Sequence, residues 1–285
     1  MENKGIELAI NSANLKGNFS WNTNFNISAN RNKVVNIGNI QQFFPADIIS
    51  SQLKVTNMGI VQVGEPLGQF YGLLSDGIFQ RQAEIDVSAQ KTAKPGERRY
   101  IDLNGDGVIN GDDRIVIGNA QPKFIGGITN TFSYKGVELS IFLQGVYGND
   151  ILNINRFELD NINGFTNTAK NTLNRWTPIN PSTSIPRASQ LRAAYDLSNI
   201  QVEDGSYLRA KSISLAYNLP ATISNRARLK TARIYVSAIN WLTLTHYSGY
   251  DPEVSRFGQN NLLQGADYGS YPGMKSIIIG LNLGL

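Results

Sequence analysis

Apolar and polar side chains alternate along residues 124–147, and this pattern restricts the fold more than any other feature of the chain. In the second half of this stretch every other position is apolar, at Val137, Leu139, Ile141 and Leu143, against Glu138, Ser140 and Gln144. Successive side chains of a β-strand point to opposite sides, so a period of two gives one apolar and one polar face. Lys135-Gly136 supplies the tight turn of a hairpin. A sheet with such different faces must lie between an apolar and a polar environment.

The same period recurs along the chain and predicts nine strands. They begin near Ile6, Phe19, Leu53, Leu67, Phe124, Val137, Tyr207, Ala232 and Ile277. The polar positions of the first two strands are mostly Asn and Ser, which suits a water-filled lumen, because an unpaired amide in a dry core costs about 1 to 3 kcal/mol. The last strand has an aliphatic face without a polar interruption, formed by Ile277, Ile279, Leu281, Leu283 and Leu285.

Short and long links alternate between the predicted strands. The short ones are near residues 14–18, 64–66, 135–136 and 220–231, and the long ones include 80–123, 148–206 and 247–274. Short turns on one rim and long loops on the other are typical of outer-membrane β-barrels, whose long loops face outward. Nine antiparallel strands cannot close on themselves, so we expect an open, all-β barrel wall. A soluble β-sandwich or jelly roll is the alternative that also shows alternation.

Composition excludes several other classes. The 285 residues contain no cysteine, which rules out disulfides and thiolate metal sites, and no apolar run approaches the roughly 18 residues of a spanning helix. The net charge of +4 comes from scattered Lys and Arg, without a nucleic-acid footprint. The amino end has no basic region followed by an apolar one, so we expect Met1 to be an internal boundary of a longer protein.

Residues 102–113 form a calcium-loop-like motif. Asp102, Asn104 and Asp106 stand at positions one, three and five, the Val108 carbonyl at seven and Asp113 at twelve. Hard oxygen ligands at this spacing are those that Ca²⁺ takes in helix-flanked loops. Here no helix is expected to follow, and Asp113 reaches less far than the usual Glu. The alternative is a metal-free loop held by hydrogen bonds from side chains to backbone.

Other side chains are candidates for weaker roles. Trp176, Tyr147 and Tyr195 are candidates for stacking on a sugar or peptide, with packing inside a loop or an interfacial aromatic girdle as the alternative. His246 has no second imidazole with which to share a metal and is expected at the surface. No nucleophile-elbow motif accompanies the Ser and Asp residues, so we expect no enzyme.

Several stretches together resemble a known family. They are Gly68-Gln-Phe-Tyr-Gly72, Asp102–Asp113 followed by Ile117–Phe124, Ser214–Pro220, Tyr250-Asp-Pro-Glu253 and Asp267–Pro272. In this order the chain resembles the C-terminal third of SusC/RagA-type TonB-dependent outer-membrane transporters of Bacteroidetes. One departure is the terminal Leu285, where many outer-membrane proteins end in an aromatic residue.

The resemblance implies part of a 22-stranded barrel with long extracellular loops, at 80–123 and 148–206 in this chain. It also implies an N-terminal plug and a TonB-contacting segment outside this chain, a SusD-like lipoprotein over the loops, outer-membrane lipid around the barrel, and oligosaccharides or oligopeptides as substrates. We therefore predict part of an outer-membrane importer. The alternative is a soluble, secreted β-sandwich binding module with a calcium-stabilised loop.

Overall fold

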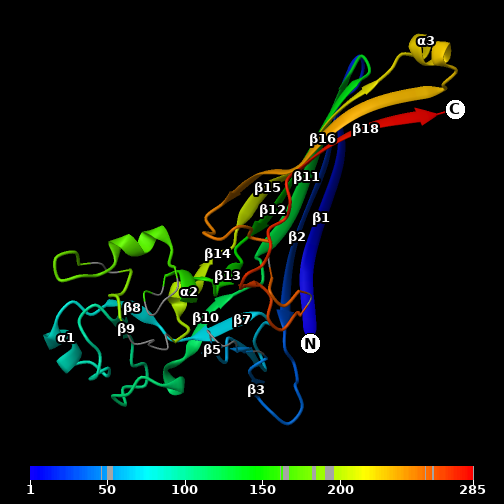
Figure 1. Ribbon diagram of the computed structural model, residues 1–285. Helices are drawn as coiled ribbons and strands as arrows, with labels where there is room; N and C mark the ends of the chain where they lie inside the picture. Colours follow the sequence, from blue (N-terminus) through cyan, green and yellow to red (C-terminus); the bar gives the residue numbers. More distant parts are fainter. Residues whose placement is uncertain are drawn as a thin grey trace.

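A seven-stranded antiparallel sheet dominates the structure, a computed structural model (Figure 1). It describes residues 1–45, 47–49, 54–160, 162, 167–181, 184–189, 196–253, 255–258 and 260–284. The sheet contains, in spatial order, β1 (Glu2–Leu15), β2 (Phe19–Lys33), β11 (Phe124–Tyr134), β12 (Val137–Tyr147), β15 (Tyr207–Asn218), β16 (Thr231–Thr245) and β18 (Ser276–Gly284). We call this sheet the wall. Neighbours in the wall follow one another along the chain, and every pairing is antiparallel.

The wall has a short-turn rim and a long-connection rim. The hairpins β1–β2, β11–β12 and β15–β16 turn at the upper end of Figure 1, where the chain also ends. Lys135 and Gly136 have φ of 47° and 85°, the left-handed conformation that both central residues of a tight hairpin turn require. The links 34–123, 148–206 and 246–275 leave from the other rim. This separation confirms the predicted barrel-like plan, and each edge of the wall is open.

The prediction is wrong for two of the nine strands, which do not belong to the wall. The stretches 53–63 and 67–79 instead contain β6 (Gly59–Gln62), β7 (Gln69–Gly72) and β8 (Ser75–Ile78), which lie in separate small sheets. Ile60, Phe70 and Leu73 are each at most 3% exposed, so these segments belong to a packed core. Their mixed faces reflect burial on both sides. The wall has seven strands, which is still an odd number, so its first and last strands run in the same direction, as predicted for an open wall.

The long connections fold into small elements of their own. One sheet joins β10 (Ile115–Asn119), β7, β6 and β3 (Gln42–Phe43), and another joins β14 (Val202–Asp204), β13 (Asp150–Asn153) and β17 (Ala266–Asp267). Two-stranded pairs join β4 (Ile48–Ile49) to β5 (Lys54–Val55) and β8 to β9 (Arg98–Tyr100). The helices are α1 (Gln82–Asp86), α2 (Arg156–Leu159), α3 (Ala221–Ser224), η1 (Gly111–Asp113), η2 (Lys170–Asn174), η3 (Asn199–Gln201) and η4 (Asn225–Ala227). None of the helices in the described residues is long and apolar enough to cross a membrane.

The main hydrophobic core lies in the connections and not on the wall. Phe70 comes from the first connection, Leu152 and Leu197 from the second, and Leu263 from the third, and all four are at most 2% exposed in one cluster. The three connections therefore share one core and form a single body at one end of the wall (Figure 1). We call this body the cap. The wall itself carries large side chains that no described residue covers.

Candidate functional site: the two faces of the wall

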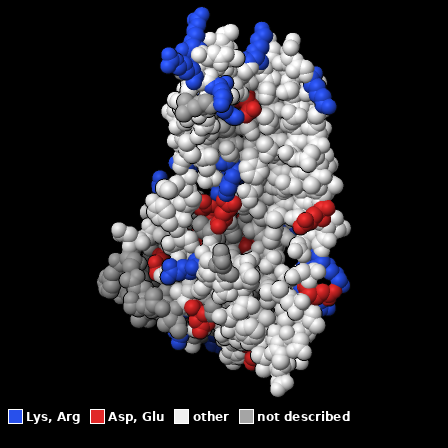
Figure 2. All heavy atoms as spheres, turned by 90° about the vertical axis from the view of Figure 1, so that its right-hand side faces the viewer, with Lys and Arg blue, Asp and Glu red and all other residues white. Residues whose placement is uncertain are grey.

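The apolar face of the wall is uncovered. Pairing aligns its side chains in rows across the strands, such as Trp21, Phe132, Leu139, Leu215, Val236 and Ile279. On β18, Ile277, Ile279 and Leu281 are 61%, 77% and 60% exposed. Figure 2 shows Lys and Arg side chains at the short-turn rim and groups of acidic and basic side chains further down the same view, with uncharged surface between them. In a soluble sandwich a second layer would cover such a face, and none of the described residues does so.

Aromatic side chains border this face at both ends. Phe19, Tyr134 and Tyr217 lie near the short turns, while Phe124 and Tyr147 stack at 5.0 Å between ring centroids near the cap. Phe124 and Tyr134 are the two ends of β11. At about 3.3 Å per residue, this strand spans roughly 33 Å, or about 25 Å along the normal for a tilt near 40°. That is the height of the apolar band of an outer-membrane barrel.

A small polar cluster interrupts the apolar face. Asn130 Oδ1 accepts hydrogen bonds from Trp21 Nε1 at 2.9 Å and Thr23 Oγ1 at 2.7 Å, and Asn14 Nδ2 donates to Thr23 Oγ1 at 2.7 Å. Polar groups that face hydrocarbon need such mutual partners, because no water is present to replace them. The one-dimensional pattern did not identify this cluster, since Asn14 joins it through a bulge in β1.

The opposite face of the wall is polar, as predicted. Its rows contain amides and hydroxyls, among them Asn22, Asn24, Asn26, Thr129, Thr131, Ser133, Ser140, Ser212, Ser214 and Ser237. Ser237 Oγ donates to Ser214 Oγ at 2.9 Å, and Arg233 Nη2 lies 2.7 Å from Glu138 Oε1. Many of these groups remain free to bind water or solute. We call this side the inner face and the apolar side the outer face.

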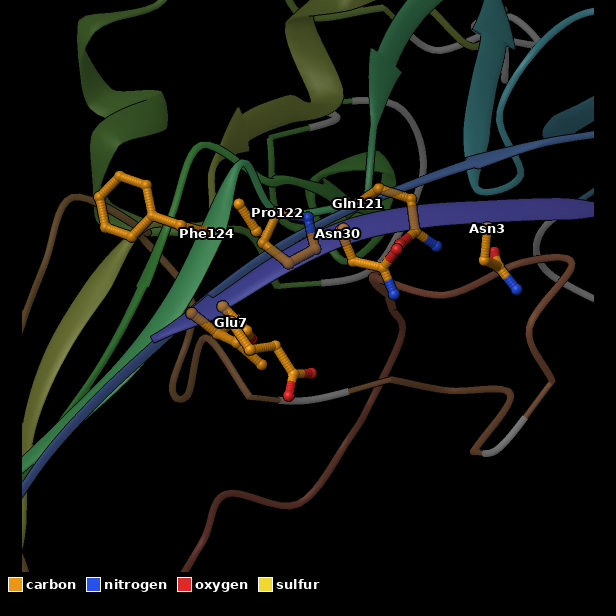
Figure 3. Close-up of a pocket in the computed structure, with 10 residues that line it drawn as sticks. Asn3, Glu7, Asn30, Gln121, Pro122 and Phe124 are labelled. Atoms are coloured by element: carbon orange, nitrogen blue, oxygen red, sulfur yellow. The ribbon is translucent and has the colours of Figure 1, made fainter. Parts of the chain in front are cut away.

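A hollow of about 450 Å³ lies where the inner face meets the cap (Figure 3). Asn3 and Glu7 of β1, Asn30 of β2 and Gln121 line it, with Phe124 at its edge. Ala29, Pro122 and Ile125 also line it, so the hollow offers both hydrogen-bonding groups and apolar contacts, which suits a solute with hydroxyl or amide groups on an apolar frame. None of them was a candidate from the sequence, because the hollow depends on how residues 121–125 pass over β1 and β2.

An ionic cluster fastens the third connection to the inner face. Arg209 of β15 donates from Nη2 to Asp251 Oδ1 at 2.6 Å and from Nη1 to Glu253, and Lys211 Nζ lies 2.8 Å from Glu253 Oε2. Burial alone would raise the pKa of Asp251, but hydrogen bonds from Arg209 and from backbone amides outweigh it and lower that pKa. The Tyr250–Glu253 motif of the sequence thus holds the cap on the wall.

The predicted calcium loop is folded around its own backbone. Asp102 accepts from the amides of Gly105 and Gly107, and buried Asp113 accepts from those of Leu103 and Asn110. The amide of Asn110 is the main cause of a lowered pKa for Asp113. Asn104, Asp106 and Val108 are exposed.

Within the described residues, no group of three or more Asp, Glu, His or Cys side chains is placed to hold a metal ion. The Asn104 amide and the Val108 carbonyl are oxygen ligands of another type. A calcium ion at the Asp102–Asp113 loop stays a prediction.

The three aromatic candidates lie in different places. Trp176 is 8% exposed inside the cap, with Nε1 2.8 Å from Gln80 Oε1. Tyr147 is 51% exposed on the outer face, in the aromatic border. Tyr195 lies outside the described residues, as does Leu285 of the predicted last strand. A role of Trp176 and Tyr147 in stacking on substrate stays a prediction.

The fold and its two faces define a partial wall of an antiparallel membrane barrel, and comparison with known proteins gives the same class. No family model matches the chain. TonB-dependent receptors P3 and P26 of Formosa agariphila are each 36% identical over 99% of the chain, and TonB-dependent receptor SusC of Bacteroides thetaiotaomicron is 24% identical over 99%. The chain spans only 26–29% of the lengths of these three relatives.

Solved structures of the RagAB peptide transporter have the same fold, with a TM-score of 0.76 and 23% identity over 99% of this chain and 29% of that one. The chain belongs to the SusC/RagA-type TonB-dependent receptors. These relatives are receptors and transporters, not enzymes.

Proposed function

We propose that the chain forms part of the barrel wall of an outer-membrane importer, with the inner face along the path of the solute. The uncovered apolar band, about 25 Å high and bordered by aromatic side chains, carries this proposal. The long-connection rim, including residues 80–123 and 148–206, then faces the cell exterior. The SusC and RagAB relatives support this placement.

The substrate class follows from the chemistry of the inner face. Its amides and hydroxyls can bind either the hydroxyls of an oligosaccharide or the backbone of an oligopeptide. We propose that the hollow around Asn30 and Gln121 is a contact point for such a solute at the entrance. A SusD-like lipoprotein would cover the cap, and TonB would act on another part of the complete receptor.

Labelling of single cysteines tests the wall, since this chain has none of its own. In the complete receptor, Ser140→Cys on the inner face should react with a membrane-impermeant maleimide. The adjacent Ile141→Cys on the outer face should react only with a lipid-soluble one. Equal reaction of both positions with the impermeant reagent would favour the soluble binding module.

Measurements of solute uptake test whether the inner face lies along the path of the solute. Asn30→Trp, which fills the hollow, should slow uptake of a fluorescent oligosaccharide or oligopeptide without reducing the amount of receptor in the outer membrane. Ala238→Trp, which adds the same bulk on the outer face, is the matched control. Unchanged uptake in Asn30→Trp would contradict the assigned contact point.

A further inference from the structure

A second hollow lies on the outer face, at its cap end. It has a volume of about 820 Å³ and is mainly apolar, with Phe25, Phe124, Leu143, Tyr147 and Leu208 among its walls. Phe124, Tyr147 and Leu208 are 39%, 51% and 45% exposed. The size falls within the range of ligand-binding pockets. We call it the outer hollow. It lies on the opposite face of the wall from the hollow of the inner face, and Phe124 lines both.

Two paired glycines form part of the lining of the outer hollow. Gly126 of β11 and Gly145 of β12 are directly opposite each other, between Ile27 and Leu208 in one row across the wall. Neither has a positive φ, but a Cβ at Gly126 would lie 2.9 Å from the carbonyl oxygen of Asn26, so only the position of Gly145 has room for a side chain. A Cβ at Gly145 would meet its nearest atoms at 3.6 Å, an ordinary contact. Glycine weakens a strand interior and often marks a place where another molecule approaches closely.

Two cations that do not line the outer hollow lie next to its residues Phe124 and Tyr147. Lys123 Nζ is 6.0 Å from the centroid of the Tyr147 ring. Arg31 Nη1 donates to the carbonyls of Pro122 and Lys123 at 3.2 and 3.1 Å. Neither forms an ion pair with a described residue. Asp204, the acid that lines the outer hollow, lies on the side of β14 and β15.

From this arrangement we infer that the outer hollow binds an acyl chain of a phosphate-bearing lipid of the lipid A type, with its phosphate at Lys123 and Arg31. An apolar hollow beside two cations matches a chain that hangs from an anionic headgroup. The inference rests on the proposed membrane wall.

Native mass spectrometry of the complete receptor in detergent, titrated with bis-phosphorylated lipid A, tests the inference. Gly145→Leu fills the hollow and should lower lipid retention about tenfold, the effect of losing roughly two buried methylenes. Gly145→Ala should give a smaller reduction. Arg31→Gln with Lys123→Gln should lower retention about fivefold for each cation removed. Dephosphorylated lipid A should bind the unaltered receptor as weakly as the bis-phosphorylated lipid binds this double variant.

Ala238→Leu is the matched control, because it adds similar bulk to the outer face away from the hollow, and it should retain lipid normally. Equal retention by Gly145→Leu and the unaltered receptor would overturn the inference. So would equal binding of dephosphorylated lipid A, or loss in Gly145→Leu of a receptor dimer instead of a lipid. Cysteine labelling at Ser140 and Ile141 in the same preparations tests the proposed membrane wall by itself. It therefore shows whether only the lipid inference is wrong or the membrane wall as well.

Discussion

Arg209 Nη2 lies 2.6 Å from Asp251 Oδ1, and their side chains are only 4% and 6% exposed. One residue belongs to the wall and the other to the third connection. Arg209→Ala would leave a buried carboxylate without its cation, so we expect a loss of about 3–5 kcal/mol in the free energy of unfolding. Denaturant unfolding of the complete receptor measures it. Lys211→Ala, which removes a more exposed cation from the same cluster, should cost less than about 1 kcal/mol.

Low pH should weaken the contact between Arg209 and Asp251. The pKa of Asp251 is lower when folded than when unfolded, so its stabilisation is full above the unfolded value of about 3.9 and is lost as the pH falls through the folded value. We expect protease cleavage within residues 247–274 to increase below about pH 4. Asp251→Asn should be cleaved readily at neutral pH as well. A cleavage rate independent of pH in the unaltered receptor would contradict this role for Asp251.

Isothermal titration calorimetry tests calcium at the Asp102–Asp113 loop. We expect binding heat in the unaltered protein and none in Asp102→Ala, because this residue would be the first oxygen ligand. Asp112→Asn is the control, since Asp112 is outside the ligand positions. No heat in either the unaltered protein or Asp102→Ala would show that the loop works as a metal-free turn.

Charge should be tolerated on one face of the wall and not on the other. Ile213→Arg places a cation in the apolar band and should destabilise the complete barrel in lipid vesicles by about 2–4 kcal/mol. The neighbouring Ser212→Arg points to the inner face and should have a much smaller effect. Urea titration with tryptophan fluorescence gives both values. Similar losses for both variants would remove the basis for assigning the faces.

The β11–β12 turn should depend on its glycine. Gly136 has a φ of 85°, and a Cβ there would lie 2.8 Å from the carbonyl oxygen of Asn218. Gly136→Ala should therefore lower the free energy of unfolding by at least about 1–2 kcal/mol. Gly111→Ala, where a Cβ meets open space, is the control and should be nearly neutral. The same urea titration compares the two.

The wall could be predicted from the sequence because alternation is a local property. In β12 and β18 most side chains indicate their face without reference to the rest of the chain, with Phe142 and Ile278 as apolar exceptions on the inner face. The cap could not be predicted in this way. Met58 and Phe70 lie in a core that three connections form together, and nothing in the pattern of 53–79 distinguishes such burial from that of a membrane strand.

The site was predicted in outline only. The polar character of the inner face followed from its Asn and Ser residues, but its hollow joins Asn30 to Gln121, which are far apart in the sequence. Arg209 could not be identified from the sequence for the same reason, since its acidic partners lie more than 40 residues away. Tyr147 and Trp176 were candidates for stacking on a solute because they are aromatic. The residues around them are set by the fold and could not be predicted from the sequence.

Strands β2 and β11 are paired from Phe19–Tyr134 to Ser28–Ile125 although residues 34–123 separate them. An insertion between adjacent strands adds little closure entropy, about 0.6 kcal/mol for each doubling of its length. The scaffold can therefore keep its register while the inserted segment is exchanged, shortened or enlarged. Changes in sequence can therefore remodel the cap at one end of the wall and leave the strand pairing intact.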